Sequence, residues 1–240
     1  MSDARRIDAE PGFVLHTYPY SETSLIADAF TRRHGRVALL ARGARRPRSS
    51  LRGLLIGFQP LALGWSGRGE VRTLMRAEWV GGMPLPNGEA LVCGFYLNEL
   101  IIRLLAREDP HERLYDEYSA ALAALAADAP LAATLRRFEK ELMRETGYAL
   151  RLDRDVNTGA PIEHTAHYTY DPERGPIRLS SGQSGALVVG GQALIDLAAD
   201  DFTNPSTLVE IKQLMRTLIH HRLDARPLLS RQMMRDLRDL

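Results

Sequence analysis

The spacing of hydrophobic residues changes once along the chain, and this change constrains the fold more than any other feature. Before residue 80, apolar residues form short runs that contain β-branched and aromatic side chains and are separated by turn residues. From residue 88 onward they recur every three or four positions, the period of a helix. We therefore expect an α+β chain, with strands first and helices after them.

The strand-like part predicts a small closed barrel. Five strands are expected in about 70 residues, at Phe13–Tyr18, Ser24–Thr31, Arg36–Ala41, Pro60–Trp65 and Val71–Trp79. The OB-fold is the five-stranded barrel that commonly binds oligonucleotides. Residues 1–80 are therefore predicted to form an N-terminal five-stranded OB-fold β-barrel.

The remaining residues, 81–240, are predicted to form a helical C-terminal domain. Helices are expected over residues 91–105, from Asp109-Pro110, and over Leu131–Thr146, Gln192–Ala199, Asn204–Leu223 and Leu228–Leu240. Residues 151–190 interrupt them, because this segment is irregular and rich in Gly, Pro and Asp. Within it, short strands are expected at Ala166–Tyr170 and Ala186–Val189.

Basic residues are unevenly distributed. The net charge of +1 conceals a net of +6 in residues 1–80 and of −5 in residues 81–240. Between Ala29 and Gly69 there is no acidic residue, and there are nine arginines. They are most dense in Ala41–Ser50, between two apolar segments.

This arginine cluster predicts a nucleic-acid site. Like charges repel one another, so folding alone gives no reason to gather them, whereas a cationic loop on a β-rich unit suits a polyanion. The predicted DNA-binding residues are Arg32, Arg33, Arg36, Arg42, Arg45, Arg46, Arg48 and Arg52. A solvated loop in an arginine-rich proteome is the plainer alternative. An RNA-binding OB-fold protein and an adaptor that binds an acidic protein also remain open.

Aromatic residues of the barrel segment could stack on bases or fill the core. We expect core positions for most of them, above all Phe30 and Phe58. Tyr18 and Tyr20 adjoin a turn and are expected to be exposed.

Other site classes find little support in the sequence. The one cysteine, Cys93, excludes an intrachain disulfide and a multi-cysteine zinc site. His164 and His167 have the spacing of metal ligands but lack further ligands close by, so a solvated pair is favoured. No catalytic constellation, phosphate-binding loop or Rossmann fingerprint is present, and neither an enzyme activity nor a cofactor is expected. A polar N-terminus and the lack of a membrane-length apolar run predict a soluble cytoplasmic protein.

A second basic group lies on the expected helix Leu131–Thr146. Arg136, Lys140 and Arg144 are spaced i, i+4 and so share one helix face. Two interpretations carry equal weight: a solvated face balanced by neighbouring glutamates, or a cationic rim that binds an acidic peptide or more DNA.

The order and spacing of several short motifs resemble the RecO family of bacterial recombination mediators. In the barrel segment they are Phe13-Val-Leu-His16, Tyr20-Ser-Glu-Thr-Ser-Leu25, Phe30-Thr31, Gly35-Arg-Val37, Ala41-Arg-Gly-Ala-Arg-Arg46, Phe58-Gln-Pro-Leu61 and Gly67-Arg-Gly-Glu-Val71. In the helical segment they are Tyr96-Leu-Asn-Glu-Leu100, Leu135-Arg-Arg-Phe-Glu139 and Pro227-Leu-Leu-Ser-Arg231. The resemblance extends over nearly the whole chain.

This resemblance implies an N-terminal OB-fold, an all-helical C-terminal domain, and binding and annealing of single- and double-stranded DNA. The implied partners are RecR, sometimes RecF, and the C-terminal tail of single-strand-binding protein, with recombinase loading onto coated strands as the purpose. The implied place of action is the cytoplasm, at the nucleoid. Some relatives hold zinc with four cysteines, but the corresponding segment here, Asp153–Gly182, contains none, so no metal is expected.

Overall fold

The fold is described from a computed structural model, which covers residues 6–180, 185, 187–223 and 226–238. The chain divides into two compact units, Met1–Ala129 together with Leu228–Leu240, and Pro130–Pro227. The first unit thus combines the barrel with the helices that follow it and with the last helix. The domain boundary expected at residue 80 stays a prediction.

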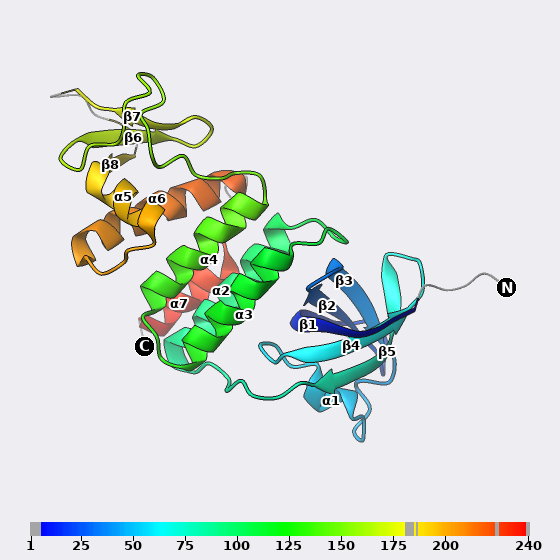
Figure 1. Cartoon of the computed structure of the whole chain (residues 1–240). Coiled ribbons are helices and arrows are strands. Elements are labelled where there is room, and N and C mark those ends of the chain that lie inside the picture. The colour runs from blue at the N-terminus through cyan, green and yellow to red at the C-terminus, as the bar shows by residue number, and fades with distance from the viewer. Residues whose placement is uncertain (1–5, 181–184, 186, 224–225, 239–240) are drawn as a thin grey trace. The chain divides into compact units, whose positions relative to one another are not determined.

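Five strands of the first unit form a closed barrel in the order β1-β2-β3-β5-β4 (Figure 1). The strands are β1 (Arg6–Pro19), β2 (Leu25–Thr31), β3 (Gly35–Ala41), β4 (Leu61–Ser66) and β5 (Val71–Trp79). The short helix α1 (Leu51–Leu54) joins β3 to β4 at one end of the barrel. This arrangement confirms the predicted OB-like fold.

β1 is more than twice as long as expected, and this length closes the barrel. Its second half, Gly12–Pro19, pairs with β2, and its first half, Arg6–Gly12, pairs with β4. The polar residues and the proline of this first half hide its strand character in the sequence. One residue, Leu15, bulges from the pairing with β2 between Val14 and His16.

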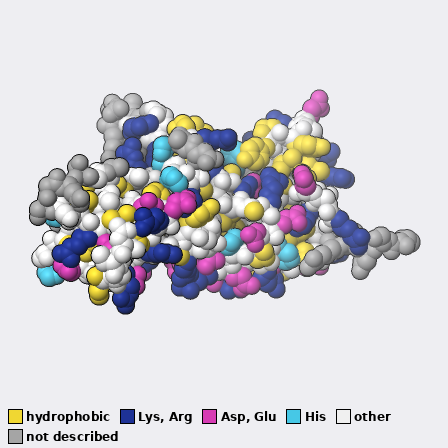
Figure 2. All heavy atoms as spheres, turned by 90° about the horizontal axis from the view of Figure 1, so that it is seen from above, with side chains coloured by type: hydrophobic (Ala, Val, Ile, Leu, Met, Phe, Trp, Pro, Cys, Tyr) yellow, Lys and Arg dark blue, Asp and Glu magenta, His cyan; other side chains and the backbone are white. Residues whose placement is uncertain are grey.

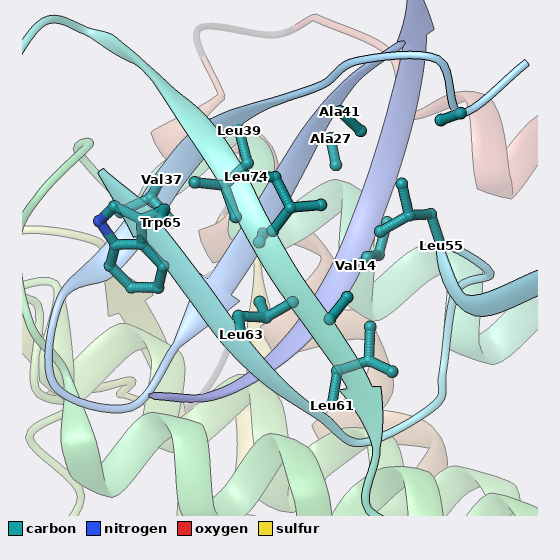
Figure 3. Close-up of a cluster of buried hydrophobic side chains, with 13 residues drawn as sticks. Val14, Ala27, Val37, Leu39, Ala41, Leu55, Leu61, Leu63, Trp65 and Leu74 are labelled. Atoms are coloured by element: carbon teal, nitrogen blue, oxygen red, sulfur yellow. The ribbon is translucent and has the colours of Figure 1, made fainter. Parts of the chain in front are cut away.

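The barrel interior is filled by side chains that alternate along the strands (Figure 3). Val14, Ala27, Val37, Leu39, Leu63 and Trp65 belong to this cluster of buried residues, which also includes Leu55 from the segment after α1. Trp65 is 1 % exposed and is the largest fully buried side chain of the chain's described part. The barrel therefore has a packed core rather than a channel.

Helices α2 (Gly88–Leu104) and α3 (Glu112–Ala126) follow the barrel within the first unit. Phe13 and Phe30 are buried as expected, but they do not belong to the barrel interior. Their rings contact Tyr115 and Tyr118 of α3, with centroid distances of 5.2–6.0 Å. They fill the core between the barrel and α3 rather than the barrel interior, because alternation along β1 and β2 turns them to the outer face of the barrel.

The second unit combines helices with a small sheet. Its helices are α4 (Leu131–Glu145), α5 (Gly191–Ala199) and α6 (Pro205–Arg222). β6 (His167–Asp171), β7 (Gly175–Arg178) and β8 (Val188–Gly190) form a sheet in the order β7-β6-β8. β6 matches the first strand expected in this segment, and β8 overlaps the second, whose residue Ala186 lies outside the described residues.

α7 (Leu229–Arg238) returns to the first unit and packs against α2. Among the helices of the described residues, none is long and apolar enough to cross a membrane.

Candidate nucleic-acid interface

The eight arginines predicted to bind DNA fall into two structurally different groups. Arg32, Arg33 and Arg36 belong to the turn between β2 and β3 and to the start of β3. Arg42, Arg45, Arg46, Arg48 and Arg52 lie in the segment that leaves β3 and enters α1. We call residues 42–52 the cationic loop.

The first group is held by acidic side chains of the same unit. Arg32 makes a bidentate contact with Asp116, with both nitrogen–oxygen distances 3.0 Å, and a further contact with Glu112. The hydrogen bonds from Arg32 hold the pKa of the Asp116 carboxyl below its ordinary value. Arg33 donates from its backbone and side chain to Glu10, which is fully buried.

Of the three arginines, Arg36 is the most deeply buried and holds parts of the unit together. It is buried and pairs with Asp28 at 3.0 Å. It also donates to the backbone carbonyl oxygens of Ile102, in the last turn of α2, and of Leu105, directly after α2. This arginine therefore joins the barrel to the carboxyl end of a helix, where cations are favoured. One sequence signal points to this role, because Asp28 and Arg36 lie on strands expected to be neighbours.

The cationic loop is ordered by contacts of its own. Ala44 is fully buried and belongs to the barrel core, so it anchors the middle of the loop. Arg45 donates from its backbone to Thr23 and from its guanidinium to the carbonyl oxygen of Ser21, at 2.9 and 2.7 Å. These bonds join the loop to the β1–β2 turn.

The other four arginines of the loop face solvent. Arg42, Arg46, Arg48 and Arg52 are exposed, and across the part of the chain that the structure describes they have no side-chain hydrogen bond or ion pair. Gly43 has a φ of +69°, in the left-handed region that favours glycine, and it lets the chain turn directly after β3. The loop thus presents unpaired positive charge on an anchored backbone.

Exposed aromatic rings lie on the strand and turn beside this loop. Tyr18 is 41 % exposed and Tyr20 is 62 % exposed, which confirms the expectation for both residues. Tyr18 contacts the ring of His16 edge-on, at a centroid distance of 4.5 Å. Figure 2, seen from above relative to Figure 1, shows a face on which hydrophobic side chains gather with Lys and Arg side chains beside them. Such surfaces offer both stacking and phosphate contacts.

The three cations predicted to bind a partner lie on α4 in the second unit. Arg136 is buried and pairs with Glu139 at 2.6 Å. Lys140 donates to the carbonyl oxygen of Leu197 at 2.9 Å and pairs with Asp200, and Arg144 pairs with Glu141. Each cation already has an intrachain partner, and the partner-binding assignment stays a prediction.

The histidines of the His164-x-x-His167 motif are both exposed. Within the described ranges, no three or more His, Cys, Asp or Glu side chains are grouped in a way that could hold a metal ion.

Fold and surface together define an OB-fold protein whose barrel carries an anchored, acid-free arginine loop. The model of the family described as "Recombination protein O N terminal" matches residues 7–83, and that described as "Recombination protein O C terminal" matches residues 85–232. The chain belongs to the RecO family of DNA repair proteins.

Individual relatives agree over the full length of the chain. A DNA repair protein RecO from Aromatoleum aromaticum is 51% identical over all of both chains. The protein of that name from Thiobacillus denitrificans is 53% identical, over all of this chain and 96% of its own. One from Ralstonia nicotianae is 53% identical over 98% of this chain and 86% of its own. These relatives support a role in DNA repair and recombination.

Proposed function

We propose that this chain is a non-enzymatic recombination mediator whose cationic loop binds the phosphate backbone of DNA. The observation that carries the proposal is the contrast between the two arginine groups. Arg32, Arg33 and Arg36 are neutralised by carboxylates, whereas four arginines of the cationic loop have no partner within the described residues. Unpaired, exposed charge on an anchored backbone is what a polyanion needs.

The fixed backbone of the cationic loop also favours binding of a DNA strand. Binding a strand costs the entropy of fixing the side chains that contact it, and a mobile loop would add the cost of fixing its backbone. Ala44 and the hydrogen bonds of Arg45 fix that backbone before the strand arrives. The side chains of Tyr18 and Tyr20 can then stack on bases, a contact worth about 1–3 kcal/mol per base.

Annealing of complementary strands requires no chemical group under this proposal. The loop reduces the repulsion between two phosphate backbones, and the complementary bases then pair without further help from the protein. The partners implied by the family resemblance, RecR, sometimes RecF, and the tail of single-strand-binding protein, would bring this activity to coated strands for recombinase loading. We place the protein with DNA, at the nucleoid.

Charge reversal at the unpaired arginines tests the proposal. The variant carries Arg42→Glu, Arg46→Glu, Arg48→Glu and Arg52→Glu, and it spares Arg45 because this residue anchors the loop. Anisotropy of a labelled oligothymidylate at low salt should show at least a hundredfold loss of affinity. The matched control replaces the same four residues by Lys, which keeps the charge and should keep most of the affinity.

The same assay separates the alternatives. Competition with RNA of equal length should displace the DNA less effectively than unlabelled DNA does. A folded charge-reversal variant that binds the oligonucleotide normally would refute the proposal and favour an adaptor that binds an acidic protein.

A further inference from the structure

A cavity of about 300 Å³ opens on the first unit where β1, the segment after α1 and the start of α2 meet. Its lining is mostly apolar and includes Leu15, Ile56, Phe58, Leu85, Leu91 and Phe95. Three of these side chains remain well exposed although they are large and hydrophobic: Ile56 at 47 %, Leu85 at 49 % and Phe95 at 39 %. Exposed apolar residues that line one hollow indicate a binding site rather than scattered surface residues.

The backbone around this cavity is strained in a way that shapes it. Phe58 has a φ of +70°, in the left-handed region that a bulky side chain rarely adopts. Its ring meets the ring of Phe95 edge-on, with 5.1 Å between centroids. Strain of this kind tends to occur where a ligand is held.

α2 is notched to receive the Phe58 ring. A Cβ atom at Gly94 would stand 2.8 Å from Cε1 of Phe58, so only glycine leaves room at this position. Glycine inside a helix is destabilising relative to alanine. The left-handed backbone at Phe58 and the helical glycine at Gly94 are both unfavourable locally. Together they position the Phe58 ring in the wall of one cavity.

The bulge in β1 lies at the same cavity. It displaces Leu15, whose carbonyl oxygen accepts a hydrogen bond of 2.9 Å from the side chain of Asn98 on α2. Asn98 in turn accepts one from the hydroxyl of Tyr118, so the bulge is held by a buried polar chain. The hollow is therefore built into the unit and does not depend on a ligand for its form.

The cationic loop leads directly into this cavity. Arg52 is four residues from Ile56, a separation that the backbone spans in at most about 14 Å. A strand whose phosphates contact the loop therefore passes within reach of the hollow. Such a strand brings planar, largely apolar groups at regular intervals, because every base has a face that stacks on aromatic rings.

We propose that this cavity takes one unpaired nucleobase from a DNA strand held by the cationic loop. The site is separate from the outer face of β2 and β3, where OB-folds commonly bind oligonucleotides. The inference rests on the proposed function, since the loop must hold the strand for the base to enter. A base held in the cavity cannot pair, so the bound strand stays single-stranded at that position. The bases next to it remain available for pairing.

The test compares two oligomers on the full-length protein at one salt concentration. One is a labelled twelve-residue oligothymidylate, and the other is an abasic oligomer with the same backbone charge. The wild-type protein should bind the oligothymidylate at least about fivefold more tightly, because the base in the cavity and any bases stacked on Tyr18 and Tyr20 each add affinity. Phe95→Ala and, separately, Ile56→Ser should each reduce this preference and leave the affinity for the abasic oligomer unchanged. Ile56 is already exposed to solvent, so its replacement leaves the fold intact.

Met75→Ala is the matched control, because Met75 is a 59 % exposed apolar side chain on β5 that does not line the cavity. It should keep the preference. If both cavity variants also keep it, or if the wild-type protein binds the two oligomers equally, the cavity does not take a base, although the loop still binds DNA. If neither oligomer binds at all, the proposed function itself fails.

Discussion

At the scale of residues, the buried carboxylate of Asp155 holds together two segments of the second unit through hydrogen bonds. Asp155 precedes the sheet of the second unit, in the Gly-, Pro- and Asp-rich segment 151–190. Its Oδ1 accepts hydrogen bonds from the backbone of Asn157 and Thr158 and from the Thr158 hydroxyl, and its Oδ2 accepts one from the backbone of Arg178 at 2.5 Å. One buried side chain thus closes a turn and fixes β7.

These contacts predict a pH dependence of stability. Burial raises the pKa of Asp155, but the four hydrogen bonds outweigh burial and hold it below its ordinary value. The stabilisation is therefore fully present above the ordinary pKa of an aspartate and is lost as the pH falls through the lower, folded-state value. Asp155→Asn places an amide donor among backbone donors and should cost about 1–3 kcal/mol near neutral pH.

Urea unfolding between pH 7 and pH 3 measures this effect. The variant should lose less stability than the wild-type protein as the pH falls, because it lacks the titrating group. Parallel pH curves for the two proteins would contradict the role given to Asp155.

At the scale of elements, one carboxylate from α2 caps the start of α7. Glu99 accepts hydrogen bonds from the backbone of Leu229 and Ser230 and from the Ser230 hydroxyl, at 2.6–2.9 Å. Burial raises the pKa of Glu99, but these bonds and Arg103 more than offset it and leave the pKa below its ordinary value. The capping groups are the first backbone N–H donors of α7, which otherwise have no helical partner.

Glu99→Ala should therefore loosen α7 before the rest of the unit. We expect a loss of about 1–2 kcal/mol, as for other helix caps, with faster amide exchange at residues 229–238 and unchanged exchange in the barrel. Glu89→Ala serves as the control, because Glu89 is exposed and lies on α2, the helix that also carries Glu99. Uniformly faster exchange across barrel and helix would show that the cap has no local role.

Element by element, the sequence predicted strands and helices well where packing follows a regular period. β5 and α4 match their expected ranges almost residue for residue, because glycine-containing turns bound β5 and a helical stripe marks α4. The first half of β1, α1 and β7 were missed, since they are short or polar and depend on neighbours for their pairing. The apolar cavity was missed for a similar reason, because the left-handed Phe58 and the notch at Gly94 are set by tertiary contacts.

The candidate site shows the same limit. Charge counting located the cationic loop, yet it could not separate Arg36, which is buried against Asp28, from Arg42, which faces solvent. The difference depends on strand register and on the carboxylates that the fold brings near each arginine. Likewise, the helical spacing of Arg136, Lys140 and Arg144 said nothing of the intrachain partners that hold all three.

At the scale of the whole molecule, the uneven distribution of charge along the chain acquires a structural meaning. Residues 1–80 carry a net charge of +6, and much of their positive charge that lacks an intrachain partner lies in the cationic loop. The later residues carry −5, and Arg136, Lys140 and Arg144 of α4 are each paired with an acidic side chain. Under the proposed function, the attraction for polyanions is concentrated in the cationic loop, although the total charge of the chain is close to zero.

The salt dependence of DNA binding tests this account most directly. For single strands, the logarithm of the binding constant falls with the logarithm of salt concentration by about 0.7 for each phosphate contact. We predict that replacing Arg42, Arg46, Arg48 and Arg52 by Glu reduces this slope by roughly 3, the share of four contacts. The four Lys replacements should leave the slope unchanged. An equal slope in the wild-type protein and the folded Glu variant would contradict the account, because the phosphates would then be bound elsewhere.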